Sequence, residues 1–475
     1  MDKHLQSDVD AQLPGFNQCK GNPPVDSLVD RFPVEIASRI FYFTIDDPDT
    51  ADTWWSKKQT KGPLILGAVN RTWRAIAWTT PQLWAFIHIG ITLKRVALRT
   101  ELTKEWLARS GQLPLTIVVS WMDYQTSDTS LALDPFVDTI NGYANRWRSL
   151  EVKLPFTSLS RLFCNPVPQS QLEVLKIFSS HPNQHHLAPT DRLIFANVNL
   201  HPQRVQLLHV SLDSINLRWD NLMHLDVDAP FMDQCLEILS HAPQLQYCNF
   251  SGITWRGEGF QIPSSPITHS LLRELSLSSS IQVLFSGSQP LLLNALVLPS
   301  LEQLKLDIEQ HTLQPLLSLI GRSSWPLRKL YLTLWAIDHE AVEDELIEVL
   351  HAISSLQEFE LNAFYINMRT ITDHFLARLN FPQLQIFNYT GIRFFSWEGL
   401  TVFATGFHSS GSSNSRPQTM CIRLENLEDG YIEEDYINKE SLKSLILLRD
   451  AGLDITIAAR RVGTNYRGAN VKPEA

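Results

Sequence analysis

The stretch 301–306 reads Leu301-Glu-Gln-Leu304-Lys-Leu306, and its spacing decides how most of this chain folds. In a β-strand, alternate side chains point to the same side, so the last two leucines face one core. The pattern, with other apolar residues at some positions, starts at positions 245, 272, 301, 327, 356 and 384. The steps between successive starts are nearly constant. This regularity predicts a periodic array of strands.

Four further units with the same apolar spacing precede this array. They start at positions 147, 172, 205 and 222, which are unevenly spaced, so the first part of the array is expected to be irregular. These units are Trp147-Leu150-Val152, Leu172-Leu175-Ile177, Val205-Leu208-Val210 and Leu222-Leu225-Val227.

Segments with apolar residues at helical spacing lie between several of the strands, at 232–241, 313–320, 341–353 and 371–379. One strand and one helix cannot bury their own apolar faces, but stacked neighbours can. The period of the regular units resembles that of leucine-rich repeats, which is roughly 20–29 residues. The resemblance implies a solenoid with parallel strands inside and helices outside. The Asn or Cys that normally follows the strand in these repeats is absent, so the solenoid is expected to be irregular.

The segment 32–84 is unusually rich in apolar residues for its length. Asp30 can cap a helix with Pro33 in its first turn, and a second helical run holds Val69 and Trp73. Helices this short hold no core alone, because that takes roughly 40 residues or more. The apolar residues therefore bury against the rest of the chain or against a partner. The residues alone leave these two alternatives equally open.

The order Phe32-Pro-x-Glu-Ile36, Ile40-Phe41, Val69-x-x-x-Trp73-Arg74, Leu83-Trp84 resembles an F-box of the kind carried by proteins of mushroom-forming fungi. The polar insertion 46–62 and the Phe at position 32, where the family prefers Leu, depart from it. The resemblance implies that this segment contacts the adaptor subunit of a cullin-RING ubiquitin ligase. The matching contact positions are Pro33, Ile36, Ile40, Val69 and Trp73.

These patterns divide the chain into five parts. We expect an α/β protein with a disordered N-terminus (1–27), a helical F-box domain (28–90), a linking helix–strand–helix block (91–146), the leucine-rich-repeat solenoid (147–460) and a disordered tail (461–475).

Composition narrows the possible functions. The chain has 475 residues, 44% of them hydrophobic, and a net charge of -10, which argues against a general nucleic-acid binder. No apolar run approaches the ~18 residues that span a bilayer, so no membrane partner is expected. Five scattered cysteines without a C-x-x-C pair suggest reduced thiols in a cytoplasmic or nuclear protein.

A search for catalytic motifs gives no candidate active site. The sequence has no phosphate-binding glycine loop, no H-E-x-x-H and no G-x-S-x-G. The histidines of 181–186, near Asp191, are the best metal candidate, yet a solvated loop is the favoured interpretation. The acidic run 343–345 is expected to be a solvated face. We therefore expect no enzyme activity, no cofactor and no metal.

The F-box resemblance implies a substrate receptor of an SCF-type ubiquitin ligase, in which the solenoid binds an unknown protein substrate. Substrate contacts are expected from outward-facing residues of the strands, namely Lys305, Tyr331, Glu360 and Asn388. Two alternatives remain: a repeat scaffold with no ligase role, and an enzyme with an unrecognised site, for which the sequence offers no starting motif.

Overall fold

A computed structural model gives the fold of most of the chain. The residues that it describes are 32–44, 62–123, 130–162, 171–179, 200–215, 217–255, 263, 265–278, 287–308, 311–334, 342–363, 371–379, 383–409, 418–426 and 437–461. The expectations for residues 1–27, for the insertion after Thr44, for the histidines of 181–186 and for residues 462–475 lie outside this part of the chain.

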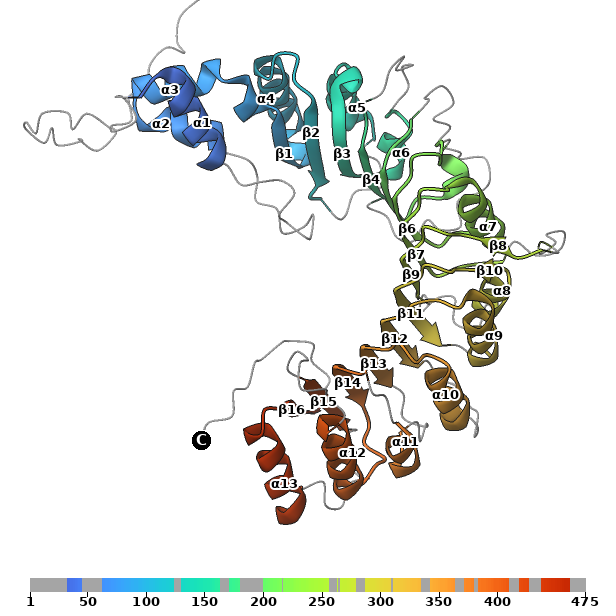
Figure 1. Ribbon diagram of the computed structural model, residues 1–475. Helices are drawn as coiled ribbons and strands as arrows, with labels where there is room; N and C mark the ends of the chain where they lie inside the picture. Colours follow the sequence, from blue (N-terminus) through green and yellow to red (C-terminus); the bar gives the residue numbers. More distant parts are fainter. Residues whose placement is uncertain are drawn as a thin grey trace, which may run out of the picture.

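One curved sheet of 14 parallel strands runs through the described residues, and its strands follow one another in chain order (Figure 1). The two short strands β8 (Ile267–Thr268) and β10 (Leu296–Val297) pair separately with each other. The strands of the large sheet are β1 (Phe86–Ile91), β2 (Leu115–Trp121), β3 (Trp147–Leu154), β4 (Val174–Ser179), β5 (Arg204–Leu208), β6 (His224–Asp228), β7 (Tyr247–Ser251), β9 (Glu274–Ser278), β11 (Gln303–Ile308), β12 (Lys329–Leu334), β13 (Glu358–Ala363), β14 (Ile386–Gly391), β15 (Thr419–Asn426) and β16 (Asp454–Arg461).

Thirteen α-helices accompany the strands in the described part of the chain, together with short 3-10 helices such as η4 (Pro81–Trp84). The helices are α1 (Val34–Thr44), α2 (Gly62–Val69), α3 (Arg71–Thr79), α4 (Val96–Arg109), α5 (Ser130–Asn141), α6 (Phe156–Leu159), α7 (Met232–His241), α8 (Ser288–Asn294), α9 (Leu313–Ser323), α10 (Val342–His351), α11 (Asp373–Arg378), α12 (Trp397–Ser409) and α13 (Lys439–Asp450).

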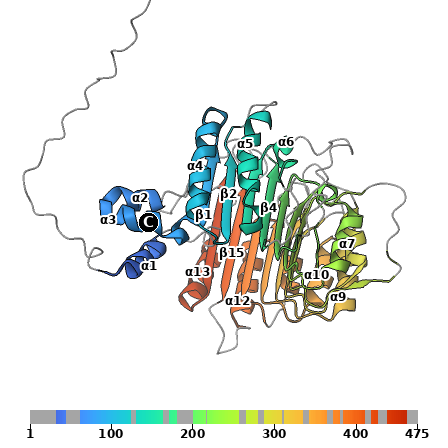
Figure 2. The same ribbon diagram turned by 90° about the horizontal axis from the view of Figure 1, so that it is seen from above.

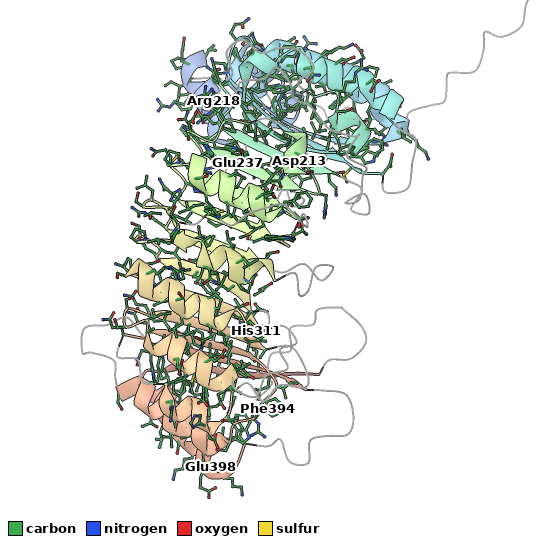
Figure 3. All side chains as sticks on the ribbon, turned by 90° about the vertical axis from the view of Figure 1, so that its right-hand side faces the viewer. Asp213, Arg218, Glu237, His311, Phe394 and Glu398 are labelled. Atoms are coloured by element: carbon green, nitrogen blue, oxygen red, sulfur yellow. The ribbon has the colours of Figure 1, made fainter. Side chains whose placement is uncertain are left out.

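The strands line the inner side of the arc and the connecting helices cover its outer side (Figure 1). Figure 3 looks onto this outer side, where Glu237 of α7 and Glu398 of α12 belong to helices that lie along the arc. The expected mixed α/β fold is thus confirmed. The helices expected at 232–241, 313–320, 341–353 and 371–379 are present, with ends that differ by at most one helical turn.

The spacing that defined the repeat corresponds to the core. Leu304 and Leu306 of β11 are fully buried. They pair with the equally buried Leu330 and Leu332 of the next strand. Equivalent leucines of neighbouring strands therefore lie side by side. Together they form a continuous apolar layer between the sheet and the helices.

One unit differs from the sequence prediction. We expected Val205, Leu208 and Val210 to fill its three apolar positions. The sheet instead pairs Val205 with Leu175 and Leu207 with Ile177. Leu207 is buried and Leu208 is half-buried, so the expected register was wrong in this unit.

The sheet also begins earlier than expected. Strand β1 pairs with β2, so the expected domain boundary after residue 90 falls inside a strand. Trp84, Ile87 and Ile89 repeat the apolar spacing of the later units and are all buried. Helices α1 to α3 stand before this first strand, at one end of the arc (Figures 1 and 2).

Carboxylates in the helices link successive units. Glu343, in the first turn of α10, accepts hydrogen bonds from the backbone N–H groups of Thr372 (3.0 Å) and Phe375 (3.1 Å) at the start of α11. Asp373, in α11, accepts one from the N–H of Ser396 (2.8 Å), just before α12. These bonds satisfy helix N-termini that would otherwise lack partners.

Candidate functional site

Helices α1 to α3 form a small unit with its own inner face. Ala37 and Phe41 lie one helical turn apart on α1, and both are buried. The ring of Phe41 packs against Trp73 of α3, with ring centroids 4.8 Å apart. Asn70 caps α3 by accepting a hydrogen bond from the N–H of Trp73 (2.7 Å). These buried contacts determine which faces of the three helices point away from the unit.

A close approach holds α2 against α3. Gly67 faces the ring of Trp78 so closely that a Cβ at this position would lie 2.1 Å from Cζ3 of that ring. Trp78 in turn packs edge-on against Trp84 of η4, whose indole N–H donates to the carbonyl of Ala77 (2.8 Å). This chain of contacts joins the N-terminal helices to the core of the first strand.

The outer faces of these helices are strongly apolar and exposed. Within the described part of the chain, nine of the eighteen exposed large hydrophobic side chains belong to residues 32–69. On α1, Ile36, Ile40 and Phe43 follow one another at helical spacing and are 46%, 36% and 71% exposed. We call this set, with Val69, the N-terminal apolar surface. Folded proteins rarely expose large contiguous apolar patches, so this surface is the candidate binding site.

The five expected adaptor contacts divide into two kinds. Pro33, Ile36, Ile40 and Val69 are exposed. Trp73 is half-buried, because its ring packs on Phe41. Of the two alternatives that the sequence leaves open, burial within the chain applies in part to Trp73, whereas the other four side chains are exposed.

The four expected substrate contacts share one row of the sheet. Lys305, Tyr331, Glu360 and Asn388 are paired in register on four neighbouring strands, from β11 to β14. They alternate with the buried leucines and therefore lie on the inner face of the sheet. The Tyr331 hydroxyl donates to Glu358 (2.8 Å). Burial, together with this carboxylate, raises the pKa of Tyr331.

The same row contains a polar cluster that the sequence reading did not single out. Both carboxylate oxygens of Asp226 accept amide hydrogen bonds, from Gln206 (2.7 Å) and Asn249 (2.8 Å). Burial raises the pKa of Asp226. The rings of His224 and Tyr247 stack beside it, 6.1 Å apart. Gln206 joins the row only in the corrected register of β5, which is why the cluster was missed.

Metal-ligating clusters and membrane-spanning helices were both sought among the described residues. No group of three or more His, Cys, Asp or Glu side chains in these ranges is placed to hold a metal ion. The acidic run 343–345 contains the Glu343 carboxylate that caps α11, so this residue has a structural contact. Among the helices described, none combines the length and the apolar character needed to cross a membrane.

Comparison with known proteins gives no match: no protein-family model and no curated protein matches the chain.

Proposed function

We propose that this protein is a substrate-recruiting receptor of an SCF-type cullin-RING ubiquitin ligase. In this proposal α1 to α3 form an F-box that binds the adaptor subunit. The strand–helix units form an irregular leucine-rich-repeat solenoid that binds a protein substrate. The protein would work in the cytoplasm or nucleus and would contribute no catalytic side chain.

The exposure of Ile36, Ile40 and Val69 carries the proposal. Burying a side chain of this size against a partner contributes about 1.5–3 kcal/mol. The chain leaves these residues exposed, whereas comparable side chains such as Leu304 and Leu306 of the sheet are fully buried. The F-box resemblance supplies the partner, because its contact positions coincide with four of the exposed residues.

The mechanism would be tethering. A receptor that holds adaptor and substrate together raises the local concentration of substrate lysines near the ubiquitin-conjugating enzyme. The inner row from Lys305 to Asn388 is the surface proposed for the substrate. The alternative, a repeat scaffold without a ligase role, uses the same inner face but needs no adaptor.

Affinity purification with mass spectrometry separates the two functions. The tagged full chain is expressed under proteasome and neddylation inhibition, beside a variant carrying Ile36→Asp and Ile40→Asp. We expect the unaltered chain to recover the adaptor and a cullin, and the variant to lose both while keeping its substrate. Recovery of neither by the unaltered chain would favour the scaffold.

A further inference from the structure

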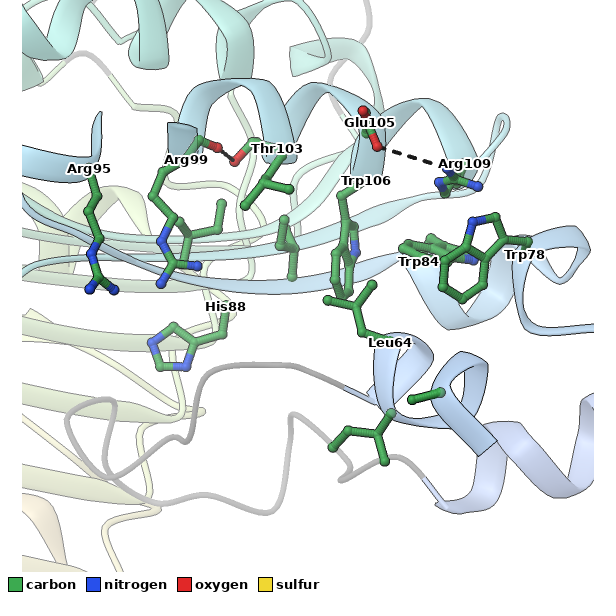
Figure 4. Close-up of a pocket in the computed structure, with 15 residues that line it drawn as sticks. Leu64, Trp78, Trp84, His88, Arg95, Arg99, Thr103, Glu105, Trp106 and Arg109 are labelled. Carbon is green, nitrogen blue, oxygen red and sulfur yellow. Dashed lines mark hydrogen bonds and ion pairs between the residues drawn. The ribbon is translucent and has the colours of Figure 1, made fainter. Parts of the chain in front are cut away.

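A groove separates the N-terminal helices from the first strand–helix unit (Figure 4), and none of its lining residues belongs to the N-terminal apolar surface. It encloses about 540 Å³. One wall is α4, and the opposite wall is α2, which contributes Leu64 and Ile65. Strand β1 forms part of the floor with His88.

The middle of the groove is apolar. Trp106 of α4 and Leu64 of α2 face each other across it in Figure 4. Leu64, Ile65 and Leu102 are 46%, 61% and 46% exposed, so they offer apolar area that the chain itself leaves uncovered. A partner side chain placed between these walls would bury that area.

The ends of the groove are cationic. Arg95 and Arg99 lie at one end and Arg109 at the other. Among the lining residues that the structure describes, Glu105 carries the one carboxylate. Its oxygen is 3.9 Å from the Arg109 guanidinium and its side chain is 72% exposed, so this surface pair is weak and can be exchanged for a ligand carboxylate.

Arg109 is held in place by two aromatic rings. Its guanidinium lies 5.3 Å from the ring centroid of Trp78 and 5.2 Å from that of Trp84. Cation–π contacts with two rings restrict where this guanidinium can lie, and an arginine side chain can bind a carboxylate through two parallel hydrogen bonds. The groove therefore offers a preorganised anion contact beside an apolar slot.

We propose that this groove binds a short segment of a partner protein in which carboxylates flank a run of about three residues with large apolar side chains. Arg99 and Arg109 are ten residues apart, which is roughly 15 Å along a helix. An extended segment covers that span in about four to five residues. The occupant thus carries acidic residues about four positions apart with apolar residues between them. The inference does not depend on the proposed ligase role.

Fluorescence anisotropy with the full chain tests the proposal. The probe is a fluorescein-labelled peptide, Asp-Glu-Leu-Trp-Ile-Glu-Asp. Its two comparison peptides replace either the acidic residues by Lys or the three central residues by Ser-Gly-Ser. We expect saturable binding of the first peptide and at least tenfold weaker binding of both others. If the Ser-Gly-Ser peptide binds as tightly as the first peptide, the groove has no apolar binding slot. If the Lys peptide binds as tightly, the arginines do not select acidic residues.

Variants locate the binding. Arg109→Ala should weaken binding of the acidic probe at least tenfold, which corresponds to about 1.4 kcal/mol, because a hydrogen bond to a charged group is lost. Leu102→Asp, at an exposed position, should weaken it further by repulsion. The matched control Arg218→Ala removes an exposed arginine between β5 and β6, four strands or more from β1 in the sheet, and should change nothing. Unchanged affinity in Arg109→Ala and Leu102→Asp would overturn the proposal.

Two further measurements test whether this chain's own insertion fills the groove and whether the groove is needed to bind the adaptor. The polar insertion of this chain is itself acidic and contains Trp54 and Trp55. Replacing residues 46–57 by a Gly-Ser linker should leave probe affinity unchanged, and binding by the linker variant alone would overturn the proposal. Arg109→Ala should still bind the adaptor if the proposed ligase role is correct, so the two proposals fail independently.

Discussion

The N-terminal helices expose large apolar side chains of the kind that the strand–helix array buries. Leu304 and Leu306 are fully buried between neighbouring units, whereas Ile36 and Val69 are about half exposed. Each strand has a neighbour on both sides along the arc, except at its ends. Helix α1 has α3 on one side and no described element over Ile36 and Ile40. Stacking therefore explains the core of the array, whereas the exposed face of α1 is the feature for which we propose an external partner.

The largest expected difference comes from matched truncations in the two regions. Leu304→Ala leaves a cavity in the array and should lower the free energy of unfolding by about 2–5 kcal/mol. Ile36→Ala removes an exposed side chain and should change it by no more than about 0.5 kcal/mol. Urea unfolding of both variants checks the comparison. Equal losses would mean that Ile36 is part of a core.

Gly67 tests how the N-terminal helices are packed. A methyl group here would collide with Trp78, so Gly67→Ala should cost about 1–3 kcal/mol. Gly321, in α9, has no atom within 4 Å of such a methyl group, so Gly321→Ala should stabilise by about 0.5–1 kcal/mol. Thermal unfolding of the two variants measures both effects. Two shifts of the same sign would contradict the packing of α2 on α3.

Glu343 tests the carboxylate links between units. Glu343→Ala removes the partner of two backbone N–H groups at the start of α11 and should cost about 1–2 kcal/mol. The neighbouring Asp344→Ala removes an exposed carboxylate that pairs with His374 and should cost less than about 0.5 kcal/mol. Chemical unfolding of the pair compares them. Indistinguishable variants would show that the link is unimportant.

Asp226 should produce the smallest effect, and it depends on pH. Its pKa is raised in the folded chain, so folding is favoured by this group at acidic pH. That contribution is lost as the pH rises through the folded-state pKa. Asp226→Asn removes the titration, so its stability relative to the unaltered chain should increase from acidic to neutral pH. Parallel stability profiles for the two proteins would contradict the role of burial at this residue.

Much of the array could be predicted because the buried apolar positions recur at nearly regular intervals along the sequence. Leu330 and Leu332 are separated by a single position, and equivalent pairs recur at a nearly constant step, which only stacked strands explain. Strand β1 was missed because Trp84, Ile87 and Ile89 replace leucines inside the segment that resembles an F-box. The register of β5 was missed because the consecutive Leu207 and Leu208 allow two alignments.

The candidate site was predictable only in part. Helical spacing places Ile36 and Ile40 on one face of α1, and the exposure of that face follows once Ala37 and Phe41 take the inner one. The half-burial of Trp73 depends on its contact with Phe41, which belongs to a different helix, on the far side of the polar insertion. The groove forms where α2 and α4 lie opposite each other, and this arrangement cannot be read from the sequence pattern of either helix.

The most direct test of the central claim is the affinity of the full chain for purified adaptor subunit, measured by calorimetry. Ile36→Asp is compared with Val402→Asp, which places the same charge at a side chain of α12 that is 69% exposed. We predict that the unaltered chain and Val402→Asp bind the adaptor equally and that Ile36→Asp loses at least tenfold in affinity. Equal binding by all three proteins, or binding by none, would contradict the account.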